Sequence, residues 1–167
     1  MKCTSAEAGK LLKKLTDEQN SILLREISGR EFLAAVGEDV ESVRPDYDFA
    51  TTQSDLWTIE EKIRKVKHAL NVFNSTTIVP EFDVTIDEML VLIPQLTAKK
   101  FKLAKMKNKL PKVRDQTRTN SAILDYRYLN YDIDAVAAEY ERVENMLSRA
   151  QNALDAVNMT QILEIEI

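Results

Sequence analysis

The stretch Ile133–Val157, IDAVAAEYERVENMLSRAQNALDAV, carries the most regular apolar pattern of the chain. Apolar residues recur there at alternating intervals of three and four, the 3.5-residue period of a helix that packs along another helix. These positions are Ile133, Val136, Tyr140, Val143, Leu147, Ala150, Leu154 and Val157. The pattern predicts a helix over about 132–157 that acts as the packing spine of a helical domain.

Three more helices are predicted upstream. The first, over 5–36, begins at a capping box made by Thr4 and Glu7, and an acidic loop over 37–48 follows it. The second, over 51–73, repeats the three-and-four spacing of the opening stretch. The third, over 85–110, begins at another capping box, made by Thr85 and Glu88, and contains Pro94.

Two segments favour β structure. Residues 122–131 are rich in tyrosine and branched aliphatic residues, and in 162–167 apolar residues alternate with glutamates. We expect these segments to pair in a small sheet, either alone or together with 76–84, an extended loop or short edge strand. Residues 112–121 are expected to form a basic loop.

The fold class is therefore mainly α: an elongated, coiled-coil-like antiparallel bundle of four helical segments with a small C-terminal β element. We expect a single domain over 1–167, in which 1–48 is an N-terminal helix and acidic loop, 49–111 a helical hairpin and 112–167 a β-helix-β tail. The helices are longer than a compact globule of this size needs. Apolar surface is then left over for another copy, which predicts a homo-oligomer, a dimer or higher.

Composition agrees with this reading. Only 3 Gly and 4 Pro occur among 167 residues, which favours long helices over many turns. The single cysteine, Cys3, favours a reducing, cytoplasmic setting, and its place before the first capping box suggests a frayed terminus. No apolar run approaches the roughly 18 residues of a membrane span.

The net charge of −4 conceals a basic segment: residues 99–118 hold nine Lys or Arg residues and one Asp. If the helix continued through this segment, four lysines would share one stripe that two arginines extend, a candidate site for nucleic acid or an anionic surface. The six candidate residues are Lys102, Lys105, Lys109, Lys112, Arg114 and Arg118. The alternative is a solvated face neutralised by acidic residues of the same bundle or a neighbouring subunit, which the overall acidity favours.

No catalytic motif, phosphate loop or metal-ligand spacing is found, so no catalytic, cofactor or metal residue is predicted, and no small-molecule substrate is identified. A non-enzymatic protein is favoured, although enzymatic activity stays open. The tyrosines of 126–131 could form a stacking surface, but packing of the β segment onto the helices is the favoured role.

The order of these signatures resembles the septicolysin-like proteins, small bacterial helical proteins largely of unknown function. The resemblance covers about residues 50–167 and lies in Val72–Thr76, Val84–Leu90, Leu110–Arg114 and Leu147–Val157, with Gln151 and Asn158 near the end. It implies a bacterial helical protein and transfers no functional residue. The sequence thus predicts a self-associating helical scaffold or interaction protein; the alternative is a polyanion-binding module that uses 99–118.

Overall fold

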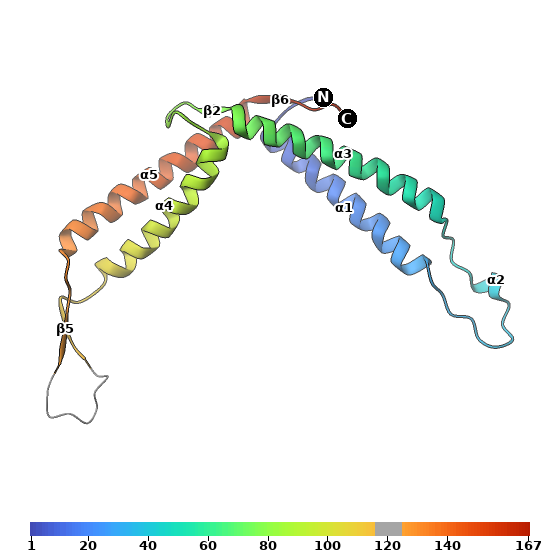
Figure 1. Ribbon diagram of the computed structural model, residues 1–167, viewed down its shortest axis with the longest axis horizontal. Helices are drawn as coiled ribbons and strands as arrows, with labels where there is room; N and C mark the ends of the chain where they lie inside the picture. Colours follow the sequence, from blue (N-terminus) through green and yellow to red (C-terminus); the bar gives the residue numbers. More distant parts are fainter. Residues whose placement is uncertain (116–124) are drawn as a thin grey trace. The chain divides into compact units, whose positions relative to one another are not determined.

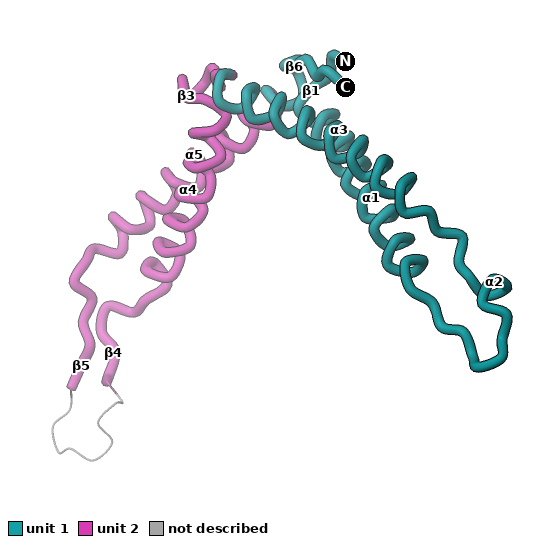
Figure 2. Tube along the Cα trace, turned by 45° about the vertical axis from the view of Figure 1, so that its right-hand side comes forward, with its two compact units in different colours: residues 1–76, 157–167 teal, residues 77–156 magenta. Residues whose placement is uncertain are grey.

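The computed structural model describes residues 1–115 and 125–167, which are mainly helical with small antiparallel strand pairs (Figure 1). The elements in chain order are β1 (Lys2–Thr4), α1 (Ser5–Gly29), α2 (Val40–Val43), α3 (Phe49–Thr76), β2 (Ile78–Val79), β3 (Val84–Thr85), α4 (Ile86–Lys107), β4 (Lys112–Arg114), β5 (Tyr126–Tyr128), α5 (Ile133–Thr160) and β6 (Ile162–Glu164). They form two compact units, residues 1–76 with 157–167 and residues 77–156 (Figure 2).

In the first unit, α1 and α3 lie side by side and antiparallel (Figure 1). The predicted capping box begins α1: the Thr4 hydroxyl accepts from the Glu7 amide, and the Glu7 carboxylate accepts from the Thr4 amide. The predicted three-and-four spacing of α3 is buried almost throughout. Its buried residues are Leu56, Ile59, Ile63, Val66 and Phe73.

The first helix is shorter than predicted, because α1 ends at Gly29 and not near residue 36. Tyr47 packs against Gly29, where an added Cβ would lie 2.9 Å from the Tyr47 Cβ. The apolar pattern continues beyond the helix in Leu33 and Val36, yet both side chains are exposed. Leu33 and Val36 lie between the end of α1 at Gly29 and the start of α3 at Phe49, so they are outside the packed helix pair.

The two ends of the chain pair as antiparallel strands, with Cys3 of β1 opposite Leu163 of β6. Both side chains are buried, so the expectation of a frayed terminus around Cys3 is wrong. A strand within 162–167 is confirmed, but the prediction that it pairs with 122–131 is wrong. Its partner β1 is only three residues long and carries no period that a sequence pattern could reveal.

In the second unit, α4 and α5 run side by side and antiparallel (Figures 1 and 2). The predicted spine of α5 is buried at six of its eight positions, while Ile133 and Tyr140 are half-buried. The facing residues of α4 are Ile86, Met89, Leu96 and Leu103. Ion pairs border this apolar seam, from Lys99 to Glu139 and from Lys100 to Glu144.

Two short strand pairs complete the second unit. Residues 76–84, expected as a loop or edge strand, fold back on themselves as β2 and β3. The second predicted capping box is confirmed, since Thr85 accepts from the Glu88 amide at the start of α4. The basic loop expected over 112–121 is wrong at its start, because Lys112–Arg114 form strand β4 and pair with β5.

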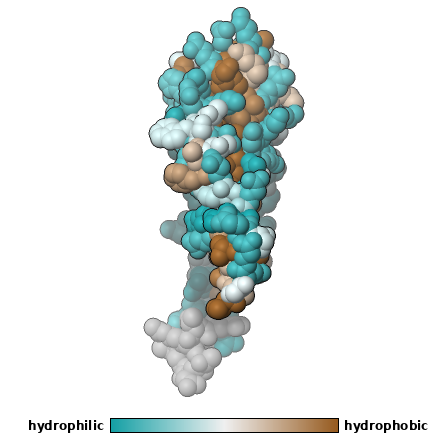
Figure 3. Space-filling model, turned by 90° about the vertical axis from the view of Figure 1, so that its right-hand side faces the viewer, coloured by the Kyte–Doolittle hydropathy of each residue, from teal (hydrophilic) through white to brown (hydrophobic). Residues whose placement is uncertain are grey.

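Large apolar side chains remain exposed in both units. On the face that Figure 3 shows, brown patches lie among polar surface. The first unit exposes Leu24, Ile27, Leu33, Val36, Phe49 and Trp57, and the second Leu90, Val91, Phe101 and Leu110. None of the helices in the described part of the chain combines the length and the apolarity that a bilayer crossing requires.

Candidate functional site

The structure places four of the six basic candidates on two different elements. Lys102 and Lys105 lie on α4, Lys109 follows the helix, and Lys112 and Arg114 lie on β4; Arg118 lies outside the described residues. The expected four-lysine helical stripe is therefore wrong. The helix ends at Lys107 with Asn108 as its C-cap, and Pro111, which disfavours helical backbone at the preceding residue, follows shortly after.

Instead of a helix, the candidates Lys112 and Arg114 belong to a two-stranded ribbon. We define the basic ribbon as β4 and β5, Lys112–Arg114 and Tyr126–Tyr128. Beyond the strands, the Leu129 amide donates to the Pro111 carbonyl, and the Tyr131 hydroxyl donates to the Met106 carbonyl at the end of α4. These bonds attach the basic ribbon to the helical hairpin.

One face of the basic ribbon combines cations with aromatic rings. Lys112 lies opposite Tyr128 and Arg114 opposite Tyr126, so all four side chains share a face. The Lys112 ammonium lies 4.2 Å from the centre of the Tyr126 ring and 5.2 Å from that of Tyr128. The Tyr128 side chain is 63% exposed, so this face is open to a ligand that carries negative charge and a flat or apolar group.

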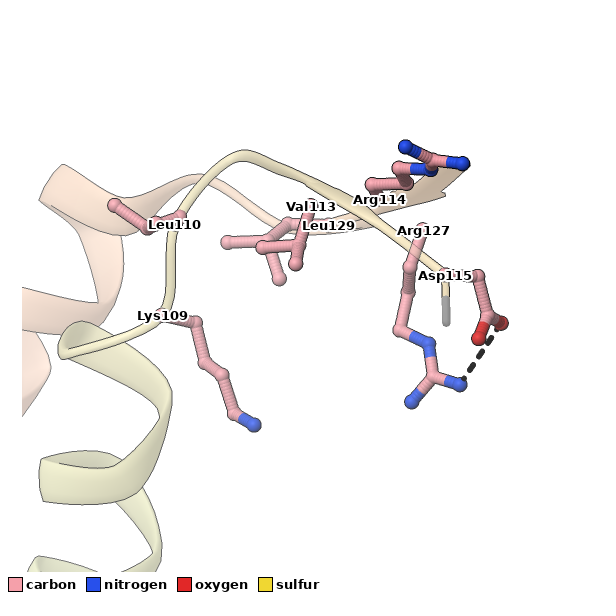
Figure 4. Close-up of a pocket in the computed structure, with 7 residues that line it drawn as sticks. All are labelled: Lys109, Leu110, Val113, Arg114, Asp115, Arg127 and Leu129. Carbon is pink, nitrogen blue, oxygen red and sulfur yellow. Dashed lines mark hydrogen bonds and ion pairs between the residues drawn. The ribbon is translucent and has the colours of Figure 1, made fainter. Parts of the chain in front are cut away.

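The opposite face carries Val113, Arg127 and Leu129 and borders a shallow hollow of about 420 Å³ (Figure 4). Lys109 and Arg127 point to the same side of the basic ribbon, away from Arg114 (Figure 4). The Arg127 guanidinium lies 3.2 Å from the Asp115 carboxylate. The second face is therefore partly neutralised, and the Lys112–Arg114 face carries the stronger positive charge.

Part of the basic segment is neutralised within the second unit. The hydrogen bonds that Arg142 and Lys99 donate to the Glu139 carboxylate lower its pKa to about 2. The hydrogen bond between Lys100 and Glu144 lowers the pKa of the Glu144 carboxyl and raises that of Lys100. These pairs agree with the alternative given above, in which acidic residues of the same bundle neutralise the lysines; here the acidic residues lie on α5. They take up Lys99 and Lys100, which are not among the six candidates.

The five candidates that lie within the described residues are exposed. Within residues 1–115 and 125–167, no carboxylate lies within ion-pairing distance of Lys102, Lys109 or Arg114. The Lys105 ammonium lies 4.1 Å from the centre of the exposed Phe101 ring. Positive charge and exposed aromatic surface thus occur together from the last turns of α4 to the basic ribbon.

The sequence pattern missed the tyrosines of this site. Tyr126 and Tyr128 were expected to pack onto the helices, but both are exposed on the basic ribbon. Two short period-two patterns could have identified them: Lys-Val-Arg at 112–114 and Tyr-Arg-Tyr at 126–128. Alternation of this kind is typical of strands and would place the two tyrosines on one face. Tyr140 does lie in the helical seam as predicted, where its hydroxyl donates to Glu144.

The described residues contain no group of three or more His, Cys, Asp or Glu side chains that could hold a metal ion. The sole histidine, His68, is exposed on α3. The basic ribbon offers groups for recognition by charge, ring stacking and apolar contact.

Comparisons with known proteins identify the fold alone. No protein-family model matches the chain, and no curated protein shows significant similarity to it. A crystal structure of a functionally unknown conserved protein from Corynebacterium diphtheriae is similar, with a TM-score of 0.63 and 13% sequence identity. The similarity covers 98% of this chain and 100% of that one, so the two proteins share a fold over their whole length.

Proposed function

We propose that this chain is a non-enzymatic helical interaction protein that associates with further copies of itself, as a dimer or higher. The observation that carries the proposal is the set of large apolar side chains that each unit leaves exposed, on α1, α3 and the acidic loop in the first unit and on α4 in the second.

This exposed apolar surface includes the outer face of α4. Val91, Pro94 and Phe101 are three and seven residues apart, so they share one side of the helix, opposite buried Leu96. Exposed apolar faces of this kind mark association surfaces. A second copy placed there would complete an antiparallel bundle, since each hairpin supplies only two helices. The elongated, coiled-coil-like bundle is thus part of this proposal.

The proposal also includes a bacterial cytoplasmic setting and membership of the septicolysin-like group. The single cysteine supports the first, because a chain with one thiol cannot form an internal disulfide bond. The order of sequence signatures described above supports the second. Neither adds a chemical role, so self-association is the part of the proposal that an experiment should address first.

The test is the mass of the protein in solution, measured by chromatography with light scattering over a wide concentration range. We expect a mass of at least twice 19.1 kDa that falls on dilution if association is reversible. A particle of 19.1 kDa at every concentration would refute the proposal.

A second candidate function is polyanion binding by the basic segment, and the Lys112–Arg114 face of the basic ribbon favours it. Cations beside exposed aromatic rings are typical of surfaces that bind single-stranded nucleic acid. The test is a titration with a single-stranded oligonucleotide at several salt concentrations. Phosphate contacts predict binding at about 50 mM salt that weakens steeply as salt rises, and absence of binding at about 50 mM would exclude this function.

A further inference from the structure

The connections between the paired helices of the two units have opposite charge. In the first unit α1 ends at Gly29, so the acidic loop is longer than the 37–48 expected; it spans residues 30–48, which carry six carboxylates and two basic residues, Arg30 and Arg44. In the second unit, the described part of the connection that follows α4, residues 108–115 and 125–129, carries four basic and two acidic residues. A chain with a net charge of −4 thus separates its charges into two surfaces of opposite sign.

Both surfaces also expose apolar groups that their own unit leaves uncovered. In the acidic loop, the Leu33 side chain is 95% exposed and that of Val36 is fully exposed. Beside the basic ribbon, Leu110 is exposed, and Tyr128 adds an exposed ring on the ribbon itself. Charge around apolar and aromatic side chains is the composition of protein–protein interfaces.

Four of the six carboxylates of the acidic loop have partners within the first unit: Glu38 accepts from the Ala35 amide at 2.8 Å, and Glu41 pairs with Arg44. Asp39 and Asp48 are structural, because they accept from the Glu41 amide at 3.2 Å and the Thr51 amide at 2.6 Å, at the starts of α2 and α3. Glu31 and Asp46 make no hydrogen bond or ion pair within the described residues. They are therefore available to meet positive charge from outside the unit.

We infer that the acidic loop of one copy docks on the basic ribbon of a second copy. This inference rests on the proposed self-association and names the two surfaces that would meet. Opposite charge selects the pair, and contact of Leu33 and Val36 with Tyr128 would remove apolar surface from water on both sides. A nucleic acid would satisfy the basic ribbon but leave Leu33 and Val36 exposed, so the second copy accounts for both surfaces.

Each copy carries both surfaces, so the contact joins unlike patches. Two copies can exchange the contact reciprocally and close into a dimer, or the contact can repeat head to tail. The mass in solution distinguishes the two, since the first stops at two copies and the second grows with concentration.

The test uses reversal of charge on each surface. One variant combines Lys109→Glu, Lys112→Glu and Arg114→Glu; the other combines Glu31→Lys, Glu38→Lys and Asp46→Lys. Asp39 and Asp48 are kept because they cap helices, and Glu38→Ala alone controls for loss of the hydrogen bond that the Ala35 amide donates to Glu38. Each variant alone then carries two like-charged surfaces, and we expect its association to weaken by about tenfold or more. An equal mixture of the two variants should associate again. The acidic ribbon of the first variant then meets the basic loop of the second, and the unaltered surfaces of the two variants also have opposite charge.

The matched control for the lysine–arginine variant is Lys10→Glu, Lys13→Glu and Lys14→Glu, which makes the same change in net charge on exposed positions of α1. It should associate like the unaltered chain. Circular dichroism checks that each variant keeps its helices. A measurement without variants supports the same point: raising salt from about 50 mM to about 500 mM should weaken association of the unaltered chain, because salt screens the charges.

The outcomes separate the inference from the proposed function. A monomeric unaltered chain would refute self-association itself. Association of the unaltered chain that neither charge reversal nor salt changes would leave self-association standing and overturn this inference. Failure of the mixture to associate would overturn it as well. Loss of oligonucleotide binding in the lysine–arginine variant with unchanged association would instead assign the basic ribbon to nucleic acid.

Discussion

The two units use the same plan, a pair of antiparallel helices, but differ in how polar groups enter the helical seam. In the first unit they bond across it: Gln19 donates to Glu60 at 3.1 Å, and Gln53 and the Tyr47 hydroxyl both donate to Glu26. In the second unit ion pairs between α4 and α5 border an apolar seam. Hydrogen bonds between side chains thus cross the first seam, whereas ion pairs flank the second.

The connections differ more than the helices do. The first unit joins α1 to α3 by an acidic loop that contains the short helix α2, whereas the second joins α4 to α5 through the strands of the basic ribbon. Two helix pairs of the same plan thus carry connections of opposite charge, the acidic loop and the basic ribbon. Recognition by this protein is therefore expected at the connections and outer helix faces.

The largest expected effect tests whether the two units unfold separately. Met89 is fully buried in the second unit, so Met89→Ala should lower its free energy of unfolding by about 2 to 5 kcal/mol. Urea unfolding gives the total loss, and hydrogen exchange shows where it falls. We expect faster exchange in α4 and α5 and little change in α1. Met159→Ala, at an exposed position, is the control; equal loss of protection in both units would mean that they unfold together.

The next prediction asks which helix face associates. Replacing Val91 and Phe101 together by Ser should weaken self-association by about tenfold or more, because aromatic anchors dominate interfaces. Both side chains are exposed, so the helical content should stay unchanged. Trp57→Ser is the counterpart in the first unit. Dilution followed by light scattering measures both, and a larger effect of Trp57→Ser would move the apolar contact from α4 to α3.

A smaller effect compares the two capping boxes. Thr4 begins α1 and Thr85 begins α4 with the same reciprocal bonds. Each Thr→Ala change should reduce the free energy of unfolding by about 1 kcal/mol, because it removes the partner of one helical amide. Thermal unfolding of the two variants, with Thr58→Ala as an exposed control in the middle of α3, measures the difference. A larger loss of unfolding free energy in one variant than in the other would show that the capping box of that unit contributes more to its stability.

The smallest effect concerns acid. Glu139 has a folded pKa of about 2, below its ordinary value of 4.5. A carboxyl with a lowered folded pKa stabilises the fold above its ordinary pKa, and this contribution is lost as pH falls from about 4.5 to about 2. Glu139→Gln should therefore flatten the decline in melting temperature over that window. Glu141→Gln, an exposed change of the same charge on α5, should leave the decline as it is.

Much of the fold was predictable because its signals are local. The spacing of apolar residues identified the buried faces of α3 and α5, and two capping boxes located the starts of α1 and α4. The candidate site was predictable only in part. Charge density located the basic segment, but the assumption of a continuous helix put Lys109 and Lys112 on the wrong element.

What the sequence by itself determined is therefore which segments are helical and which face of each is apolar, since these follow from neighbours within a few turns. The tertiary structure decided which segments meet: β6 pairs with β1 at the far end of the chain, and β5 with β4. Strands of three residues carry too little pattern to specify a partner, and only packing selects one. For the same reason, Leu33 and Val36 could be read as a helix face, yet the structure leaves them exposed beside the carboxylates of the acidic loop.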